Sequence, residues 1–262
     1  MANKTISYTV DEKGIAVITL SYPETPAAMS TPSVQEMTDL LGMMEQAREI
    51  RAVIIISESP REGPETDWTD LDRRNNSALS FYHQLEEANR FAVTLADLNK
   101  PVIAAFNGPA TGIGLSIALA ADLAIVSTKT NFSELLDHVG LIPDIGGTYL
   151  LPRLVGKAKA KEILFTHHRI TAQEALQLGL VSQVVSPDEV LSTAYGLAEK
   201  IVQGPPFAFS VAKRMINHCD EIDIHAALHM EALSQTLAVC SYDHKEGVNA
   251  LFENRKPDFK GD

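Results

Sequence analysis

The first part of the chain alternates between apolar runs of strand type and segments with helical spacing. Residues 5–10 and 15–20 read as two strands on either side of the turn-forming sequence at 11–14, which predicts a β-hairpin. Over residues 33–49 apolar positions recur every three or four residues, as on one face of an amphipathic helix. The β-branched run at 52–56 then predicts a strand that is buried on both faces.

The same order continues downstream. A helix is predicted over residues 77–98, a strand over 102–106, a small-residue helix over 112–121 and a strand over 123–127. Strands and helices that alternate in this way predict the α/β class.

The pattern changes near residue 186, where the strand signal ends. Three helices and a shorter one are expected after it, at residues 187–202, 206–219, 224–239 and after Asp243. We therefore divide the chain into a βα core, residues 1–205, and a C-terminal helical region, residues 206–262.

Composition narrows the classes of protein. Of 262 residues, 45% are hydrophobic and 21% are charged, as in a globular protein that buries a full core. The net charge of −12 opposes binding to nucleic acid and to anionic membranes. No apolar run is long enough to span a bilayer and no secretory signal is visible, so a cytoplasmic protein is expected. Two cysteines are too few for a disulfide framework or a thiolate metal site.

Two segments differ from this average. Between Arg153 and Arg169 the basic residues outnumber the single acid, Glu162, which indicates either a solvated helix face or a site for a phosphate-bearing ligand. The acidic segment 57–76 is the expected mobile loop. Its Trp68 either lines a ligand or packs the loop onto the core.

The glycine-rich turn at 107–116 is the stretch most informative about chemistry. Its glycines follow a strand and open a helix, so backbone amides without helical partners can converge on an anion or a developing oxyanion. The spacing fits neither the dinucleotide fingerprint nor the phosphate-binding P-loop. We therefore expect an anion or oxyanion site at the start of this helix.

Blocks of sequence typical of one protein family occur in order along nearly the whole chain. They lie at residues 101–108, 121–123, 140–148, 151–156, 172–185 and 246–259. Together they resemble the crotonase (enoyl-CoA hydratase/isomerase) superfamily. The resemblance implies an α/β spiral of ββα turns, followed by a helical region that packs between subunits of a homotrimer or a dimer of trimers. It also implies an acyl-CoA thioester as partner, with coenzyme A as part of the substrate and no separate cofactor.

In this superfamily two backbone amides hold the thioester oxygen and stabilise an enolate. By position, the resemblance assigns these amides to Thr69 and Ile113. It implies further substrate contacts around them, at Trp68, Asp70, Leu71, Gly112, Ser116 and Leu136.

Two positions depart from the family pattern. Hydratases of the superfamily carry two glutamates that hold a water and move its proton, whereas this chain has Ser116 and Leu136. A hydroxyl is not a carboxylate base near neutral pH, and leucine transfers no proton. Hydration by two glutamates is therefore not expected.

One carboxylate stands in a suggestive place, at Asp144. Epoxyphenylacetyl-CoA isomerases, the ring-opening branch, have aspartate there, and this chain is most similar to them, also through Ser116 and the pair Asn89-Arg90. Independently of the resemblance, a lone carboxylate in an apolar pocket has its charged form disfavoured, which raises its pKa. The expected lining residues are Leu135, Leu136, Leu141 and Ile142. The alternative role is helix capping, which would lower that pKa.

The groups that would hold coenzyme A are less complete. The basic side chain that the superfamily usually carries is missing at 26–29, which leaves a backbone contact from Ala28. Phosphate contacts are expected either from Lys256 and Lys260, in this subunit or a neighbour, or from the basic segment 153–161. No metal site is predicted, since His225 and His229 lack a third ligand.

The leading hypothesis is an acyl-CoA isomerase in which Asp144 alone moves the proton. An enoyl-CoA hydratase with a different acid/base set and a non-catalytic acyl-CoA-binding scaffold are the alternatives. The sequence leaves the acyl group open.

Overall fold

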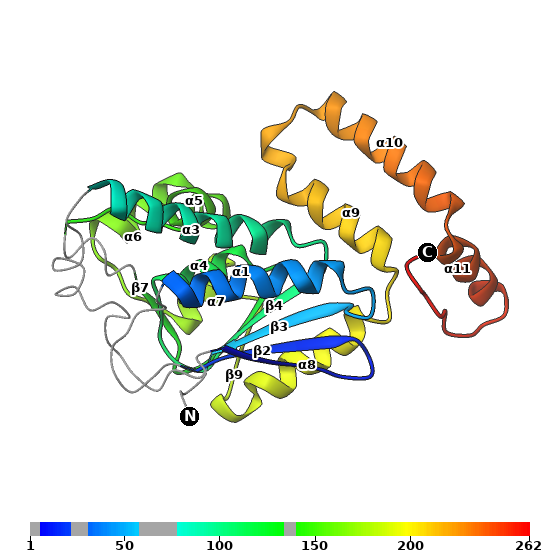
Figure 1. The fold of residues 1–262 in the computed structure, drawn as a ribbon, viewed down its shortest axis with the longest axis horizontal. Helices are drawn as coiled ribbons and strands as arrows, with labels where there is room; N and C mark the ends of the chain where they lie inside the picture. Colours follow the sequence, from blue (N-terminus) through cyan, green and yellow to red (C-terminus); the bar gives the residue numbers. More distant parts are fainter. Residues whose placement is uncertain (1–5, 22–30, 58–77, 134–139) are drawn as a thin grey trace.

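The computed structural model describes residues 6–21, 31–57, 78–133 and 140–262. It shows a layered α/β core from which a group of helices projects at the C-terminal end (Figure 1). The main sheet has the strand order β1-β2-β3-β4-β6-β9. These strands are β1 (Ile6–Val10), β2 (Ile15–Leu20), β3 (Ala52–Ser57), β4 (Val102–Phe106), β6 (Leu123–Ser127) and β9 (Gln183–Val185).

The sheet begins with the predicted hairpin. β1 and β2 pair antiparallel, with Ile6 opposite Leu20, and every later neighbour in the main sheet pairs parallel. β3 and β4 are buried along their whole length. Because side chains alternate between the faces of a strand, Ile55 joins the hydrophobic cluster on one face and Ile54 the cluster on the other.

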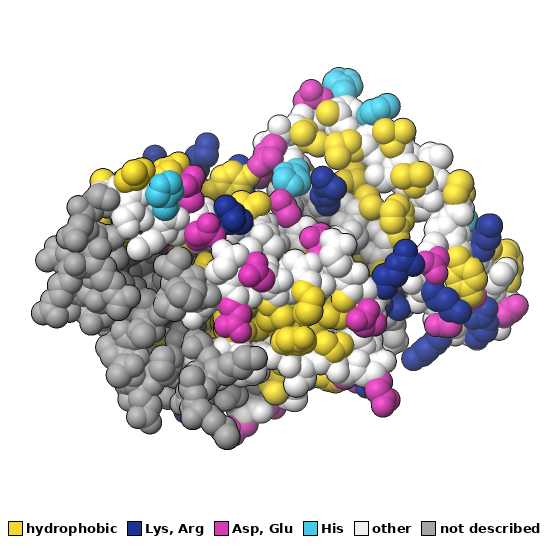
Figure 2. Space-filling model, in the orientation of Figure 1, with side chains coloured by type: hydrophobic (Ala, Val, Ile, Leu, Met, Phe, Trp, Pro, Cys, Tyr) yellow, Lys and Arg dark blue, Asp and Glu magenta, His cyan; other side chains and the backbone are white. Residues whose placement is uncertain are grey.

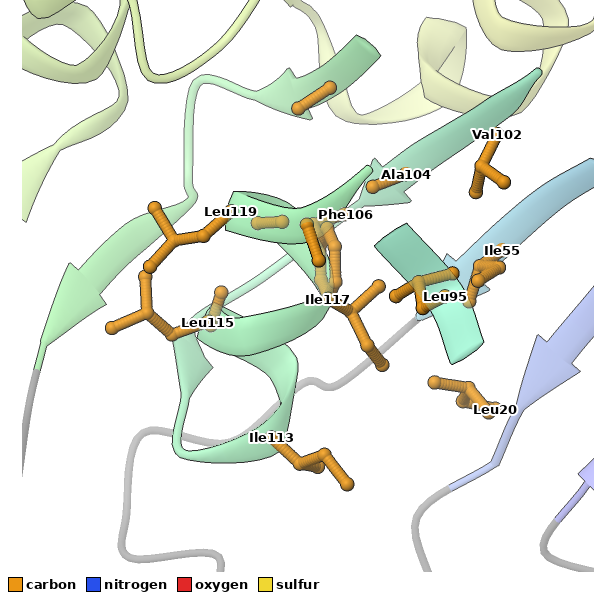
Figure 3. Close-up of a cluster of buried hydrophobic side chains, with 14 of the residues drawn as sticks. Leu20, Ile55, Leu95, Val102, Ala104, Phe106, Ile113, Leu115, Ile117 and Leu119 are labelled. Atoms are coloured by element: carbon orange, nitrogen blue, oxygen red, sulfur yellow. The ribbon is translucent and has the colours of Figure 1, made fainter. Parts of the chain in front are cut away.

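Helices cover both faces of the main sheet. On one face α1 (Thr31–Gln46), α3 (Ala78–Asp97) and α4 (Ile113–Ala120) contribute to the larger cluster. Figure 3 shows part of it, with Leu95 of α3 and Ile117 of α4 beside Ile55 of the sheet. On the other face α8 (Val190–Ile201) packs its small side chains against the sheet.

A second, smaller sheet contains β5 (Ala110–Thr111), β7 (Asn131–Ser133) and β8 (Ile170–Thr171). The chain passes from β4 to β5 and α4, and then from β6 to β7 and α5 (Gly147–Val155), so a strand-strand-helix unit is repeated across the two sheets. This is the expected spiral of ββα turns. α6 (Lys157–Phe165) and α7 (Ala172–Leu178) complete the core before the 3-10 turn η2 (Pro187–Glu189).

The C-terminal region is helical, as predicted. It contains α9 (Pro206–Asn217), the 3-10 turn η3 (Cys219–Glu221), α10 (Ile224–Cys240) and α11 (Tyr242–Phe252). α10 has no buried residue, and it lies away from the layered core in Figure 1. α9 starts next to the boundary predicted at residue 205, which stays a prediction.

Polar contacts fasten the last residues to α11 and to the core. The buried Asp243 carboxylate accepts the backbone amides of Lys260 (2.7 Å) and Gly261 (2.9 Å). The guanidinium of Arg51, in the loop before β3, donates to the carbonyls of Phe259 (2.9 Å) and Gly204 (2.8 Å). Arg51 thus ties the C-terminal segment to the core, and Arg48 adds an ion pair with Asp262 at 3.8 Å.

The sequence placed these elements closely, with differences at their ends. The helix predicted over 33–49 spans Thr31–Gln46, and the helix predicted over 112–121 begins only after Gly112. The short strands β5, β7 and β8 and the helices α5, α6 and α7 were not delimited from the sequence. Runs of two or three strand residues are too short to show a periodicity.

Candidate active site

The glycine turn forms the start of α4, as predicted. Gly112 has a φ of 50° and a ψ of −122°, a conformation that side chains rarely permit, and Ile113 is the first helical residue. Amides in the first turn of a helix have no helical acceptor and lie at the positive end of the helix dipole. The Ile113 amide is therefore available to an oxygen that gains negative charge. Figure 3 shows Ile113 at this end of the helix.

Ser116, which replaces one family glutamate, lies on the same helix. It is buried, and its hydroxyl donates to the carbonyl of Gly112 at 3.3 Å. The hydroxyl is therefore already hydrogen-bonded to the backbone at the start of its own helix, and it is not a proton-transfer base.

Asp144 lies on a cavity of about 300 Å³ between α3 and the segment that leads into α5. From α3 come Phe81, Leu85 and Asn89, spaced one helical turn apart so that they share a face. The other wall is made by residues 141–146 and Thr148. Of the predicted apolar neighbours of the carboxylate, Leu141 and Ile142 belong to this wall, and Leu135 and Leu136 lie outside the described residues.

The cavity changes the acidity of Asp144. Burial raises the pKa of its carboxyl above the ordinary value, and a hydrogen bond from its own backbone amide lowers that pKa by less. Among the described residues that line the cavity, Asp144 is the one titratable side chain. The result is a carboxylate whose charged form is partly desolvated and without an opposing charge from the cavity wall.

Helix capping by Asp144 was the alternative. The N-cap of α5 is Gly146, in the left-handed conformation, and the helix has no side-chain cap. It is the backbone carbonyl of Asp144 that accepts the Gly147 amide, at 2.8 Å. The first turn of α5 is therefore closed by the main chain, which leaves the carboxylate to the cavity.

Several predicted site residues lie outside the described residues, together with most of the acidic segment. They are Ala28, Trp68, Thr69, Asp70, Leu71 and Leu136. Their assigned roles stay predictions, including the second oxyanion amide of Thr69.

The two candidate lysines do not approach this cavity within one chain. Lys256 and Lys260 follow α11, at the opposite end of the molecule from α5 (Figure 1). Lys260 Nζ lies 4.0 Å from a carboxylate oxygen of Asp258 and 5.5 Å from the ring centroid of Tyr242. A role for either lysine at the cavity thus requires a neighbouring subunit.

The basic segment forms exposed parts of α5 and α6. The Arg153 guanidinium stacks 3.3 Å from the ring centroid of Tyr149, and Lys159 Nζ lies 2.7 Å from a carboxylate oxygen of Glu162. Local partners of this kind are typical of a solvated helix face. The phosphate-binding interpretation stays a prediction for Lys157 and Lys161, which are also exposed.

Each histidine in the described part of the chain is exposed or has a local partner. His83 Nδ1 lies 3.2 Å from Glu86, and His225 and His229 are exposed on α10. Within residues 6–21, 31–57, 78–133 and 140–262, no three His, Cys, Asp or Glu side chains lie close enough together to hold a metal ion.

Sequence reasoning missed two features of the cavity. It predicted the helix 77–98 but not that Phe81, Leu85 and Asn89 face Asp144, although their spacing places them on one helical face. It also gave no sign that Ile145, next to Asp144, has a positive φ of 46°.

Comparison with known proteins decides the family. A family model described as enoyl-CoA hydratase/isomerase matches residues 11–262. The chain belongs to the enoyl-CoA hydratase/isomerase family. Family membership confirms the resemblance found in the sequence and identifies the protein as an enzyme that acts on CoA thioesters.

Individual relatives of the family cover nearly the full length of both chains. The short-chain-enoyl-CoA hydratase of Clostridium acetobutylicum is 35% identical over 94% of each chain. The 1,2-epoxyphenylacetyl-CoA isomerase of Escherichia coli is 31% identical over 95% of this chain and 96% of its own. The crystal structure of an enoyl-CoA hydratase from Bacillus anthracis matches with a TM-score of 0.90 at 30% identity, covering 99% of this chain and all of that one.

The fold of this family is thus the fold of the chain, and the ββα spiral is confirmed. In the described parts of the chain, no helix combines the length and the apolarity that crossing a bilayer requires.

Proposed function

We propose that this family member is an acyl-CoA isomerase in which Asp144 is the single proton-transfer group. The observation that carries the proposal is the half-buried Asp144 carboxyl, with a pKa raised by burial, on a cavity whose described lining holds no second titratable side chain. A carboxylate of this kind removes a proton from carbon more readily than a solvated one, and it returns the proton without a partner.

The reaction needs one carboxylate and an oxyanion site. Asp144 takes a proton from the carbon beside the thioester carbonyl of a 3-enoyl-CoA, and the electrons of the broken C–H bond form an enolate. The amides of Ile113 and Thr69 stabilise the oxygen. The carboxylic acid then protonates the fourth carbon as the double bond moves to the second and third carbons. Asp144 ends as a carboxylate, and no water is consumed.

Hydration is the second candidate function, and a specific observation favours it. Several relatives have names that say hydratase, among them the short-chain-enoyl-CoA hydratase of Clostridium acetobutylicum. In hydration, Asp144 would have to activate a water without the two glutamates, since Ser116 already donates to Gly112. The single carboxylate therefore favours isomerisation.

The proposed enzyme works as a homotrimer or a dimer of trimers and takes coenzyme A as part of its substrate, with no separate cofactor. The exposed apolar surface of α10 supports the assembly. A cytoplasmic location belongs to the same proposal, and the exposed free thiols of Cys219 and Cys240 fit a reducing compartment.

Kinetics of Asp144→Asn test the proposal. The substitution keeps the shape of the side chain but removes the base, so kcat for a 3-enoyl-CoA should fall by roughly 10²- to 10⁴-fold while KM changes little. Asp188→Asn, the same change at an exposed aspartate, is the matched control and should keep the parental rate. Parental turnover by Asp144→Asn would show that Asp144 is not the base.

Product analysis in labelled water separates the functions. An isomerase gives a 2-enoyl-CoA that carries no ¹⁸O when the reaction is run in H₂¹⁸O, because Asp144 returns a proton to carbon and no water is added. A hydratase gives a 3-hydroxyacyl-CoA that carries ¹⁸O. Binding of many CoA thioesters without conversion would identify a scaffold instead.

A further inference from the structure

The backbone next to Asp144 is strained. Ile145 has a φ of 46°, in the left-handed region, and Gly146 follows it with a φ of 87°. Glycine adopts this region freely, but a β-branched residue is among the least tolerant of it, because its side chain crowds the main chain. When a residue adopts a backbone conformation that its type disfavours, contacts with the surrounding structure must hold it there.

The surroundings that hold Ile145 are visible. Its side chain is half-buried and packs against the larger hydrophobic cluster, on the face of the sheet covered by α1, α3 and α4. After it, the Asp144 carbonyl accepts the Gly147 amide and the Gly146 carbonyl accepts the Leu150 amide, both at 2.8 Å. Before Asp144, the ring of Pro143 is buried and fixes φ. Both flanks of Asp144 are thus anchored.

Other left-handed residues differ in kind. Among the described non-glycine residues, His167 and Asn254 also have a φ of 52°. Both are exposed, neither lines the cavity, and asparagine and histidine are enriched in this conformation. Ile145 is the β-branched residue of the three, and it lies next to the carboxylate that the proposed reaction uses.

We infer that Ile145 is a positioning residue, whose packing holds the left-handed turn that directs the Asp144 carboxylate onto the cavity. The inference rests on the proposed function of Asp144 as the base. If the turn relaxed to an ordinary conformation, the peptide units beside Asp144 would rotate and its side chain would gain water. The packing of Ile145 thus compensates for the strain in its backbone, and the strained turn keeps the Asp144 carboxylate poorly solvated.

If Ile145 positions Asp144, replacing Ile145 should change kcat more than it changes substrate binding. A better solvated carboxylate is a weaker base, so kcat falls, whereas the coenzyme A portion of the substrate does not depend on this turn. Because no other described lining residue titrates, the acid limb of the pH profile of kcat reports on Asp144. The limb moves to lower pH when burial no longer raises the pKa of Asp144.

The test replaces Ile145 in the full-length enzyme. Ile145→Ala keeps a Cβ that disfavours the positive φ but loses the packing that holds it, so we expect kcat to fall roughly ten- to hundredfold, KM to change little and the acid limb to move down. Ile145→Val keeps branching and most of the packing and should restore both values. His167→Gly, which relaxes a left-handed residue away from the cavity, should match the parent.

A titration of carboxyl carbons by NMR with ¹³C-labelled aspartate separates this inference from the proposed function. If Ile145 positions Asp144, the titration midpoint of Asp144 falls in Ile145→Ala, whether or not Asp144 is catalytic. Loss of the proposed function alone would show as full activity of Asp144→Asn. An unchanged pH profile and midpoint in Ile145→Ala would overturn the inference. If that variant does not fold, Ile145→Thr carries the same test, since threonine keeps the branched Cβ that disfavours a positive φ and packs less well than isoleucine.

Discussion

At Asp144 the needs of folding and of chemistry oppose each other. The cavity raises the pKa of the carboxyl, so the folded protein disfavours the charged form that the proposed reaction requires. The neighbouring Ile145 adds backbone strain at the same place. Proteins commonly sacrifice stability at active sites in this way.

This conflict predicts a pH-dependent gain in stability for Asp144→Asn. With a raised pKa, the folded state binds more protons than the unfolded state above the ordinary aspartate value, so stability falls as pH rises through that window. Asp144→Asn has no carboxyl to titrate at this position, so it does not lose this stability. Urea unfolding should therefore show a higher free energy of unfolding for Asp144→Asn at neutral pH, with the difference shrinking as pH falls toward about 3.9 and absent below that value.

Asp188→Asn is the control for that measurement, because Asp188 is exposed. It should follow the parent at every pH. A difference between Asp144→Asn and the parent that grows on acidification would contradict the assignment of a raised pKa.

Single residues also mark the limit of prediction from sequence. The apolar neighbours Leu141 and Ile142 were foreseen because they are adjacent in the chain. Phe81 and Leu85 were not, because helical periodicity says which residues share a face but not what that face packs against. The left-handed Ile145 was invisible, since residue type favours the opposite conformation.

At the scale of elements, the hydrophobic pattern predicted helices and strands correctly where the segment is long enough to show a pattern. The boundaries of β2, β4 and β6 were predicted to the residue or nearly so, because these strands are continuous apolar runs bounded by turn residues. β5 and β8 contain two residues each and are set by pairing with β7. Such strands exist because the rest of the fold brings their partners together.

The order of the C-terminal segment, residues 253–262, depends on the buried carboxylate of Glu246. Glu246 accepts two hydrogen bonds from the Arg255 guanidinium, at 2.5 and 2.9 Å, and the Asp258 amide at 2.8 Å. The hydrogen bonds from Arg255, followed by the one from the Asp258 amide, lower the pKa of Glu246 to about 2. Its contribution to stability is therefore complete above the ordinary glutamate value and is lost as pH falls toward about 2.

We accordingly expect Glu246→Gln to loosen residues 253–262 at neutral pH. Glutamine offers one acceptor oxygen and no charge to Arg255, so amide hydrogen exchange at Asp258 and its neighbours should accelerate roughly tenfold or more. Glu253→Gln, at an exposed partner of the same arginine, should have little effect. Equal exchange rates in the parent and Glu246→Gln would show that the segment is held by other contacts.

At the scale of the whole molecule, the core and the helical region differ in how they bury apolar side chains. α10 spans 17 residues without a buried one, while Leu233 is 56% and Leu237 is 64% exposed. Figure 2 shows hydrophobic side chains gathered over α9 and α10. Side chains of these two helices line a hollow of about 520 Å³. Exposed apolar surface of this extent is typical of subunit contacts.

The proposed assembly can be broken at this surface. Lysines in place of Leu233 and Leu237 would be buried without partners in an interface, so subunit association should weaken roughly hundredfold or more. Sedimentation velocity should then show monomers in place of trimers. The control is Leu191→Lys, an exposed apolar position on α8, which should leave the oligomer intact. A trimer that survives both lysines would place the subunit contact elsewhere.

The two hydrophobic clusters on opposite faces of the main sheet have a practical use. α8 packs through Ala194 and Ala198 into the cluster that contains Ile54 and Ile103, whereas the cavity wall at Ile145 adjoins the other one. The closely packed strands separate these two compartments. An engineer who wants a more heat-resistant catalyst can therefore redesign the α8 compartment freely, and leave the catalytic side of the sheet untouched.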